Sequence, residues 1–257
     1  MNYKAVSDYI VNWLKEYSHS AKMNGFIVGI SGGIDSAVTS VLCAETGQEV
    51  MLLNMPIRQT SQEADRAAEH IEDLKKRFQN VSSLDVDLTS VFTSLEQVLP
   101  QQTVNNHLAM ANSRARLRMT TLYAVGQEKG LLVAGTGNKI EDFGIGFFTK
   151  YGDGGVDLSP IADLTKTEVF ELAAHFKVVQ SIRKAKPTDG LWEDGRSDED
   201  QIGASYPELE WAMDYSGDET LLTERQQEVL TIYRRLNAVN QHKMIPVPTC
   251  TIPGYLK

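Results

Sequence analysis

The chain has few of the residues that build disulfide, zinc or histidine-based sites. Its 257 residues include two cysteines, Cys43 and Cys250, which lie far apart and have no CxxC or Cys/His grouping around them. A disulfide framework and a cysteine zinc site are therefore not expected. The five histidines are scattered, and no Ser/His/Asp or Cys/His nucleophile arrangement is apparent. This cysteine usage is typical of a reducing compartment, so we expect a cytoplasmic protein.

Long apolar runs and an excess of positive charge are absent as well. No apolar run approaches the ~18–20 residues that span a bilayer, and the N-terminus leads into an amphipathic segment rather than a signal-like one. The chain carries 34 acidic and 25 basic residues, a formal net charge of −9. That balance argues against coating nucleic acid or binding a membrane surface through basic residues. We expect neither a nucleic-acid nor a membrane partner.

The composition that remains is that of an ordinary globular protein, with 42% hydrophobic and 23% charged residues. Short apolar runs predict buried strands at residues 26–30, 50–54, 81–88 and 131–135. Helical periodicity fills residues 3–17, 36–46, 61–78, 89–99, 105–127, 163–176 and 223–240. This alternation predicts an α/β fold: a three-layer, doubly wound parallel sheet of about five strands with helices on both faces.

One stretch departs from the periodic pattern. Residues 184–207 are rich in Asp, Glu, Gly and Pro, which indicates a flexible loop near the site. The remaining pattern indicates one domain across residues 1–257. In open α/β sheets, ligands bind beyond the carboxyl ends of the strands, where the strand order reverses. We therefore expect the site in the loops that follow the first, second and fourth strands.

The loop after the first strand reads Gly29-Ile30-Ser31-Gly32-Gly33-Ile34-Asp35-Ser36 and opens a helix. Glycines allow close approach of a ligand, serines offer hydroxyls, and the helix start offers free N–H groups. These features predict an anion site, although the string is neither a Walker A loop nor GxGxxG. Asp35 would repel a phosphate unless a cation lay between them, so it is a candidate magnesium ligand. The alternative is a plain tight turn with a serine cap.

This Ser-Gly-Gly-x-Asp-Ser string resembles the pyrophosphatase loop of the N-type ATP pyrophosphatases. Those enzymes cleave ATP between its α- and β-phosphates and adenylate an acceptor. They include NAD, GMP, asparagine and argininosuccinate synthetases and tRNA-thiolating enzymes. The resemblance implies that ATP, as co-substrate, is bound by the loop residues Gly29, Ile30, Ser31, Gly32, Gly33, Asp35 and Ser36, with Mg²⁺ as cofactor. It also implies a catalytic role for Asp35.

Further segments are similar to one branch, the ammonia-dependent NAD synthetases. Residues 112–119 match the family's Asn-x-x-Ala-Arg-x-Arg-Met helix, which implies that Arg116 contacts the substrate deamido-NAD; a solvated basic helix face is the alternative. Residues 131–141, LLVAGTGNKIE, match the fourth strand and its loop. The match implies that Thr136 contacts ATP and that Glu141 joins Asp35 around magnesium.

The most specific match is GFFTKYGDGGVD at residues 146–157. It implies that Lys150 and Asp157 bind deamido-NAD, that Lys150 and Asp153 are catalytic, and that Asp153 lies at the ammonia pocket. Three further matches to family positions imply roles for single residues. They imply that Lys166 is catalytic and binds ATP, that Thr188 binds ATP, and that His242 and Lys243 bind deamido-NAD.

A lysine in a first helical turn opposes the helix dipole, which favours an anionic ligand beside Lys166. The chain departs from the family pattern at Ile34, where many relatives have glutamine. It also departs at Asp142 and Phe143, where small or apolar residues are frequent.

The resemblance implies a ligase that forms a C–N bond. The carboxylate of deamido-NAD would attack the α-phosphorus of ATP, and ammonia would then displace AMP and give NAD. Two alternatives stay open: a GMP synthetase-like or tRNA-modifying ATP pyrophosphatase, and a non-catalytic nucleotide-binding protein. The family is typically a homodimer, with residues 105–127 a plausible interface element. The motifs leave no space for a glutamine-hydrolysing domain, so we expect free ammonia or a separate glutaminase partner.

Overall fold

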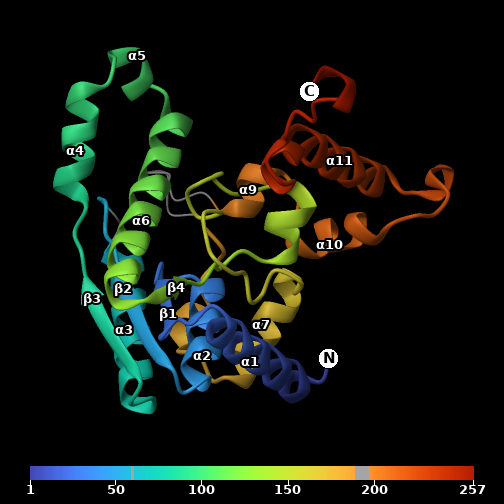
Figure 1. Ribbon diagram of the computed structural model, residues 1–257. Coiled ribbons are helices and arrows are strands. Elements are labelled where there is room, and N and C mark those ends of the chain that lie inside the picture. Colours follow the sequence, from blue (N-terminus) through green and yellow to red (C-terminus); the bar gives the residue numbers. More distant parts are fainter. Residues whose placement is uncertain (59–60, 189–196) are drawn as a thin grey trace.

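The computed structural model describes residues 1–58, 61–188 and 197–257, and residues 61–63 through their backbone alone. A parallel sheet in the order β3-β2-β1-β4 lies in the lower left of Figure 1. The strands are β1 (Gly25–Gly29), β2 (Glu49–Asn54), β3 (Val81–Asp85) and β4 (Leu131–Val133). The side chains of Phe26, Ile27 and Val28 are fully buried, because β1 is central and both of its faces are covered.

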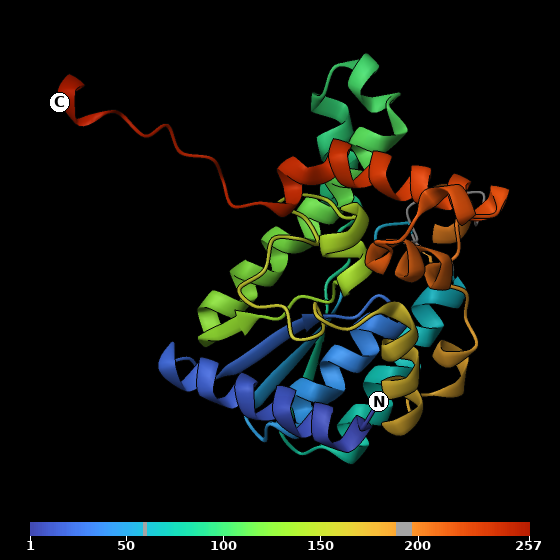
Figure 2. The ribbon, with the colours of Figure 1, turned by 90° about the vertical axis from the view of Figure 1, so that its right-hand side faces the viewer.

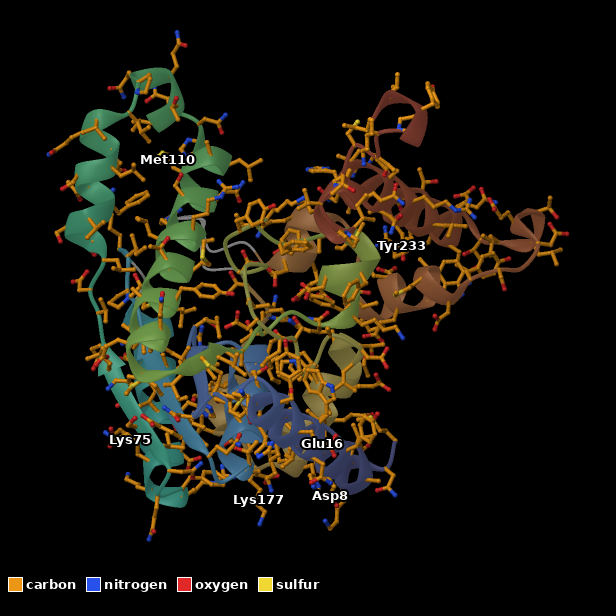
Figure 3. The ribbon with its side chains drawn as sticks, in the orientation of Figure 1. Asp8, Glu16, Lys75, Met110, Lys177 and Tyr233 are labelled. Atoms are coloured by element: carbon orange, nitrogen blue, oxygen red, sulfur yellow. The ribbon has the colours of Figure 1, made fainter. Side chains whose placement is uncertain are left out.

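Helices cover both faces of the sheet, which confirms the predicted three-layer α/β class. One face packs against α1 (Tyr3–Ser20), α2 (Ile34–Glu45), α3 (Ser61–Arg77), α7 (Lys166–His175) and α8 (Gln180–Arg183). The other face packs against α4 (Thr89–Val98) and α6 (His107–Lys129), which α5 (Gln101–Val104) connects. Met110, labelled in Figure 3, lies on α6 in this second layer. Successive residues of β1 alternate between the two cores, as a pleated strand requires.

The sheet is narrower than expected. The described residues form four strands where about five were predicted, and a single parallel bridge between Ala134 and Leu158 stands where a fifth strand would pair. This bridge lies on the side of β4 away from β1, because Gly135 N donates to Leu158 O while Ala134 N donates to Ile27 O. The bridge fixes the chain just before it, residues 146–157, beside the end of β4.

A third hydrophobic cluster joins elements from the last half of the chain. It contains η1 (Ile140–Ile145), α9 (Asp198–Ile202), α10 (Tyr206–Asp214) and α11 (Glu224–Met244). Tyr233 of α11 packs against this cluster and is labelled in Figure 3. Beyond η2 (Glu219–Leu221) and α11, residues 245–257 extend away from the body and end in η3 (Gly254–Leu256) (Figure 2).

The stretch predicted as a loop, residues 184–207, is partly helical. Its central part, residues 189–196, lies outside the described residues. Ser197 begins α9 with a capping box to Asp200, and Ser205 begins α10 with a capping box to Glu208. The S-x-x-D/E spacing was available in the sequence as a helix signal, but α9 is too short to show periodicity. Among the described helices, none has a stretch that would be stable across the apolar interior of a bilayer.

Candidate active site

Two adjoining cavities open at the carboxyl ends of β1 and β4, where the strand order reverses. The larger cavity, about 610 Å³, is lined by the end of β1, by α6, by residues 146–156 and by residues 240–243 of α11. The smaller, about 140 Å³, contains the loop after β1 and the start of α7. Ser31, Thr136, Asp153 and Thr188 line both. The topology therefore places the predicted loops at one crevice, as expected for a doubly wound sheet.

The loop after β1 has the conformation that its glycines allow. Gly32 has a φ of +80°, a value that glycine adopts without strain. Ser31 Oγ accepts a hydrogen bond from Gly33 N at 3.1 Å, and Ser36 Oγ donates to Gly33 O at 3.0 Å. Gly33 is the N-cap of α2 and provides no side-chain cap. The serines shape the turn, and the first N–H groups of α2 are left for a ligand at the cavity.

Lys166 joins the two predicted magnesium ligands. Its Nζ donates to Asp35 Oδ2 at 2.6 Å and to Glu141 Oε1 at 2.9 Å. The Lys166 side chain is 3% exposed, against 16% for Asp35 and 15% for Glu141. Lys166 is the first residue of α7 after the capping residue Thr165. The structure thus brings three predicted residues together, from the ends of three separate segments.

Burial and the neighbouring opposite charges shift the pKa values of Asp35 and Lys166 in opposite directions. Burial raises the pKa of Asp35, and the charge of Lys166 partly offsets the effect. Burial alone would lower the pKa of Lys166, but the charges of Asp35 and Glu141 outweigh it and raise that pKa. Lys166 is therefore held as a cation, because a buried ammonium is stable only beside carboxylates.

Two residues that the sequence analysis missed complete the network. Tyr206, at the start of α10, donates its hydroxyl to Glu141 Oε1 at 2.5 Å, and Lys166 Nζ lies 4.7 Å from the centre of its ring. Asn138 is fully buried and donates from Nδ2 to Asp35 Oδ1 at 3.1 Å. Its Oδ1 accepts from the backbone N of Ile140 and of Glu141. A polar Asn138 just after a strand-end Gly-Thr-Gly was a usable signal, whereas nothing local marked Tyr206.

A second cluster gathers the basic residues predicted for the acceptor substrate. Arg116 donates from Nε and Nη2 to Lys150 O at 3.3 Å each. Lys150 Nζ donates to His242 O at 2.7 Å, and Lys243 Nζ donates to Phe148 O at 2.8 Å. All four basic residues line the larger cavity. Burial lowers the pKa of the half-buried Lys243.

Two further acidic residues, Asp142 and Asp153, line the smaller cavity, and Asp153 lines the larger cavity as well. Asp153 accepts a hydrogen bond from Thr149 N at 3.0 Å, and burial raises its pKa. Burial, together with the charges of Glu141, Asp153 and Asp35, raises the pKa of Asp142 to about 8. Asp142 is one of the departures from the family pattern, and it lines the smaller cavity. Ile34, another of the departures, is buried against the core and also lines the smaller cavity.

Asp157 is the one predicted substrate residue that the structure separates from this group. Its carboxylate accepts from Val133 N at 2.8 Å and from Tyr123 OH at 3.0 Å. Among the described residues that line either cavity, Val156 is present and Asp157 is not. In this chain Asp157 holds the segment before the Ala134–Leu158 bridge against β4.

The Asp35–Glu141 pair suits a magnesium ion. Both carboxylates reach one cationic nitrogen, so they lie close enough to share a cation, and they face the cavity of the anion loop. Magnesium is typically held by one or two carboxylates together with substrate phosphates. No group of three or more acidic, histidine or cysteine side chains placed to hold a metal ion occurs in the described part of the chain, so water molecules and substrate phosphates would supply the other ligands of such an ion.

A doubly wound α/β fold with an anion loop at its switch point, an acidic pair and a basic cavity defines a nucleotide-binding enzyme of the ATP pyrophosphatase type. The model of the family described as NAD synthase matches residues 6–246. The chain belongs to this family.

Individual relatives agree with this assignment. An NH₃-dependent NAD⁺ synthetase of Carboxydothermus hydrogenoformans is 38% identical over 245 residues, covering 95% of this chain and 96% of the relative. The solved structure of an NMN synthetase from Francisella tularensis is 31% identical, with a TM-score of 0.88, and the match covers 98% of this chain and 100% of that one. An NH₃-dependent NAD synthetase of Campylobacter jejuni, 24% identical with a TM-score of 0.69, covers 95% and 93% and shares the fold.

Proposed function

We propose that the chain is an ammonia-dependent NAD synthetase, a ligase that uses ATP to amidate the nicotinate carboxylate of deamido-NAD. The observation that carries the proposal is the meeting of two sites in one crevice. The anion loop with Lys166 offers a place for the polyphosphate, and Arg116, Lys150 and Lys243 offer positive charge to a second phosphorylated substrate. A non-catalytic nucleotide-binding protein would need the first site alone.

The proposed reaction has two steps, and the residues act mainly by position and charge. In the first, a carboxylate oxygen of the acceptor bonds to the α-phosphorus of ATP, and the bond to the β-phosphate oxygen breaks. The loop from Ser31 to Ser36, with Lys166, stabilises the negative charge of the departing pyrophosphate. Mg²⁺ held by Asp35 and Glu141 would neutralise phosphate charge when bound.

In the second step, ammonia nitrogen bonds to the activated carbonyl carbon and AMP departs. Ammonium must first lose a proton, and we assign Asp153 to this task because its buried carboxylate lies at the junction of the two cavities. Unchanged ammonia KM and turnover in Asp153→Asn would remove this role. Lys150 and Lys243 are assigned to the acceptor phosphates. Ammonia would come from solution or from a separate glutaminase.

A second candidate acceptor is supported by one observation. The NMN synthetase structure matches this chain over nearly the whole length of both proteins. Asp157, assigned to the dinucleotide by resemblance, is bonded here to Tyr123 and to β4. Nicotinate mononucleotide carries the same carboxylate and one phosphate, so the basic cluster suits it as well.

One assay tests both candidates. Pyrophosphate release from ATP is measured with Mg²⁺ and ammonium, with deamido-NAD, with nicotinate mononucleotide, and with neither. Release that depends on deamido-NAD, with the higher kcat/KM for that acceptor, is the expected result. A higher kcat/KM for the mononucleotide would favour the second candidate, and release that ignores both acceptors would contradict the proposal.

The assembly that we propose is a homodimer with α6 at the interface. The proposal rests on the resemblance to a family that is typically homodimeric; on α6, Leu108 is 61% exposed and lies at the larger cavity. A fully active monomer in light scattering would contradict this proposal.

A further inference from the structure

Arg66 brings a positive charge to the anion loop from a helix outside the motifs. It lies on α3, half-buried, and its Nε donates to Gly32 O at 3.3 Å. Gly32 is the loop residue with positive φ. The Arg66 side chain lines the smaller cavity together with the loop and Lys166. Its guanidinium therefore lies at the cavity that the first N–H groups of α2 face.

The charge of Arg66 has no counter-ion among the side chains that the structure describes. Within the described ranges, Gly32 O is its hydrogen-bond acceptor and no carboxylate lies within ion-pair distance. The neighbouring acid one turn on, Glu69, bonds Ser181 Oγ at 2.5 Å instead. At the other end of the same helix, Arg77 pairs with Asp73 at 2.9 Å. A half-buried guanidinium without a counter-ion is stabilised by an anionic ligand.

The charge balance of the smaller cavity shows why such a cation is needed. Lys166 is the buried cation there, and it lies between Asp35 and Glu141. One positive and two negative charges give that group a net negative charge, which Mg²⁺ would offset when bound, so Arg66 and Lys186 on the same lining add positive charge for a polyphosphate. Arg66 has no carboxylate partner among the described side chains, and the planar fork of a guanidinium can donate two N–H groups to two phosphate oxygens at once.

We propose that Arg66 binds the terminal phosphate oxygens of ATP and holds pyrophosphate as it departs. The inference rests on the proposed function, because that function supplies a nucleotide whose terminal phosphates leave. The position of Arg66 indicates contact with these terminal phosphates and not with the nucleoside. Among the described lining residues, Arg66 belongs to the smaller cavity and not to the larger one, which has the volume for the nucleoside and the acceptor.

The test compares ligands with and without the terminal phosphates. Binding of pyrophosphate, ATP and AMP to the full chain is measured by titration calorimetry with Mg²⁺ for wild type, Arg66→Gln and Arg66→Lys. Arg235→Gln is the matched control, because Arg235 is exposed on α11 and lines neither cavity. Thermal unfolding of each variant confirms that it is folded.

Arg66→Gln is expected to weaken pyrophosphate and ATP binding by about tenfold or more, since a charge-assisted bond is lost. AMP binding and the KM of the acceptor should change less than about twofold. Arg66→Lys should be intermediate, because an ammonium lacks the two-pronged geometry. Equal weakening of AMP and pyrophosphate would mean that Arg66 only shapes the loop through Gly32, and pyrophosphate binding equal to the control would also overturn the proposal. Both of these results are binding measurements that need no turnover. Failure of this proposal can therefore be distinguished from failure of the proposed reaction.

Discussion

The buried cation at the start of α7 allows a quantitative test of the site. Lys166→Met keeps an unbranched side chain and removes the charge that separates Asp35 from Glu141. Both carboxylates are at least four-fifths buried, with exposures of 16% and 15%. Removing one partner of a buried pair typically costs about 3–5 kcal/mol, because an uncompensated charge stays in the interior. For a chain of this size, that corresponds to a fall in Tm of roughly 10 °C.

The assay is thermal and urea unfolding without nucleotide, at pH 8. Lys139→Met is the matched control: Lys139 pairs with Asp163 at 3.3 Å, with side-chain exposures of 35% and 98%. Exposed pairs contribute about 0–1 kcal/mol, so this variant should unfold near wild type. Adding Asp35→Asn to Lys166→Met should recover part of the loss, since it removes one of the unpaired charges.

A small effect would refute the reasoning. If Lys166→Met unfolds within about 1 kcal/mol of the Lys139→Met control, the ion group contributes no more than an exposed pair. If the Asp35→Asn change adds to the loss instead of reducing it, the cost arises from lost packing around Lys166 and not from unpaired charge. Either outcome would remove the electrostatic account of this site.

Two further variants test the neighbours of this group. Tyr206→Phe keeps the ring but removes the hydroxyl that donates to Glu141. We expect kcat/KM for Mg²⁺-ATP to fall about tenfold with the fold retained. Tyr215→Phe is the control, because the Tyr215 hydroxyl donates to Asp218 O at the far end of α10. Asp142→Asn tests the pH dependence, because burial raises the pKa of Asp142 to about 8. The folded state keeps a proton that the unfolded state releases above about pH 4, so the contribution of Asp142 is full below that pH and is lost as pH rises through about 8. The stability of Asp142→Asn relative to wild type should therefore rise between pH 5 and pH 9 in urea unfolding, and a constant difference would contradict the raised pKa.

The local pattern of the sequence predicted most of the framework. Short apolar runs marked β1, β2 and β4 because a strand covered on both faces needs apolar side chains throughout. The anion loop was also visible, because the strand, the glycines, the serines and the helix start lie within a few residues of one another. Positive φ at Gly32 and the turn made by Ser31 and Ser36 follow from contacts that span five residues or fewer.

Resemblance to a family added residues whose roles no local pattern indicates. Lys150 and Lys243 are ordinary basic residues in isolation, and the matched motifs singled them out. The structure places both at one cavity, where Lys150 Nζ reaches His242 O across 92 positions of sequence. It also places Asp157 elsewhere, bonded to Tyr123 and β4, a position that motif matching had no means to predict.

By itself, the sequence determined the fold class, the anion loop and the family motifs, since each depends on residues that are neighbours along the chain. The tertiary structure alone decided which charges meet. Lys166 lies 131 positions from Asp35 and 25 from Glu141, and Tyr206 lies 65 positions from Glu141. Parallel strands bring the carboxyl ends of distant segments to one crevice, so these contacts depend on strand order and not on spacing in the sequence. Arg66 reaches Gly32 across 34 positions for the same reason.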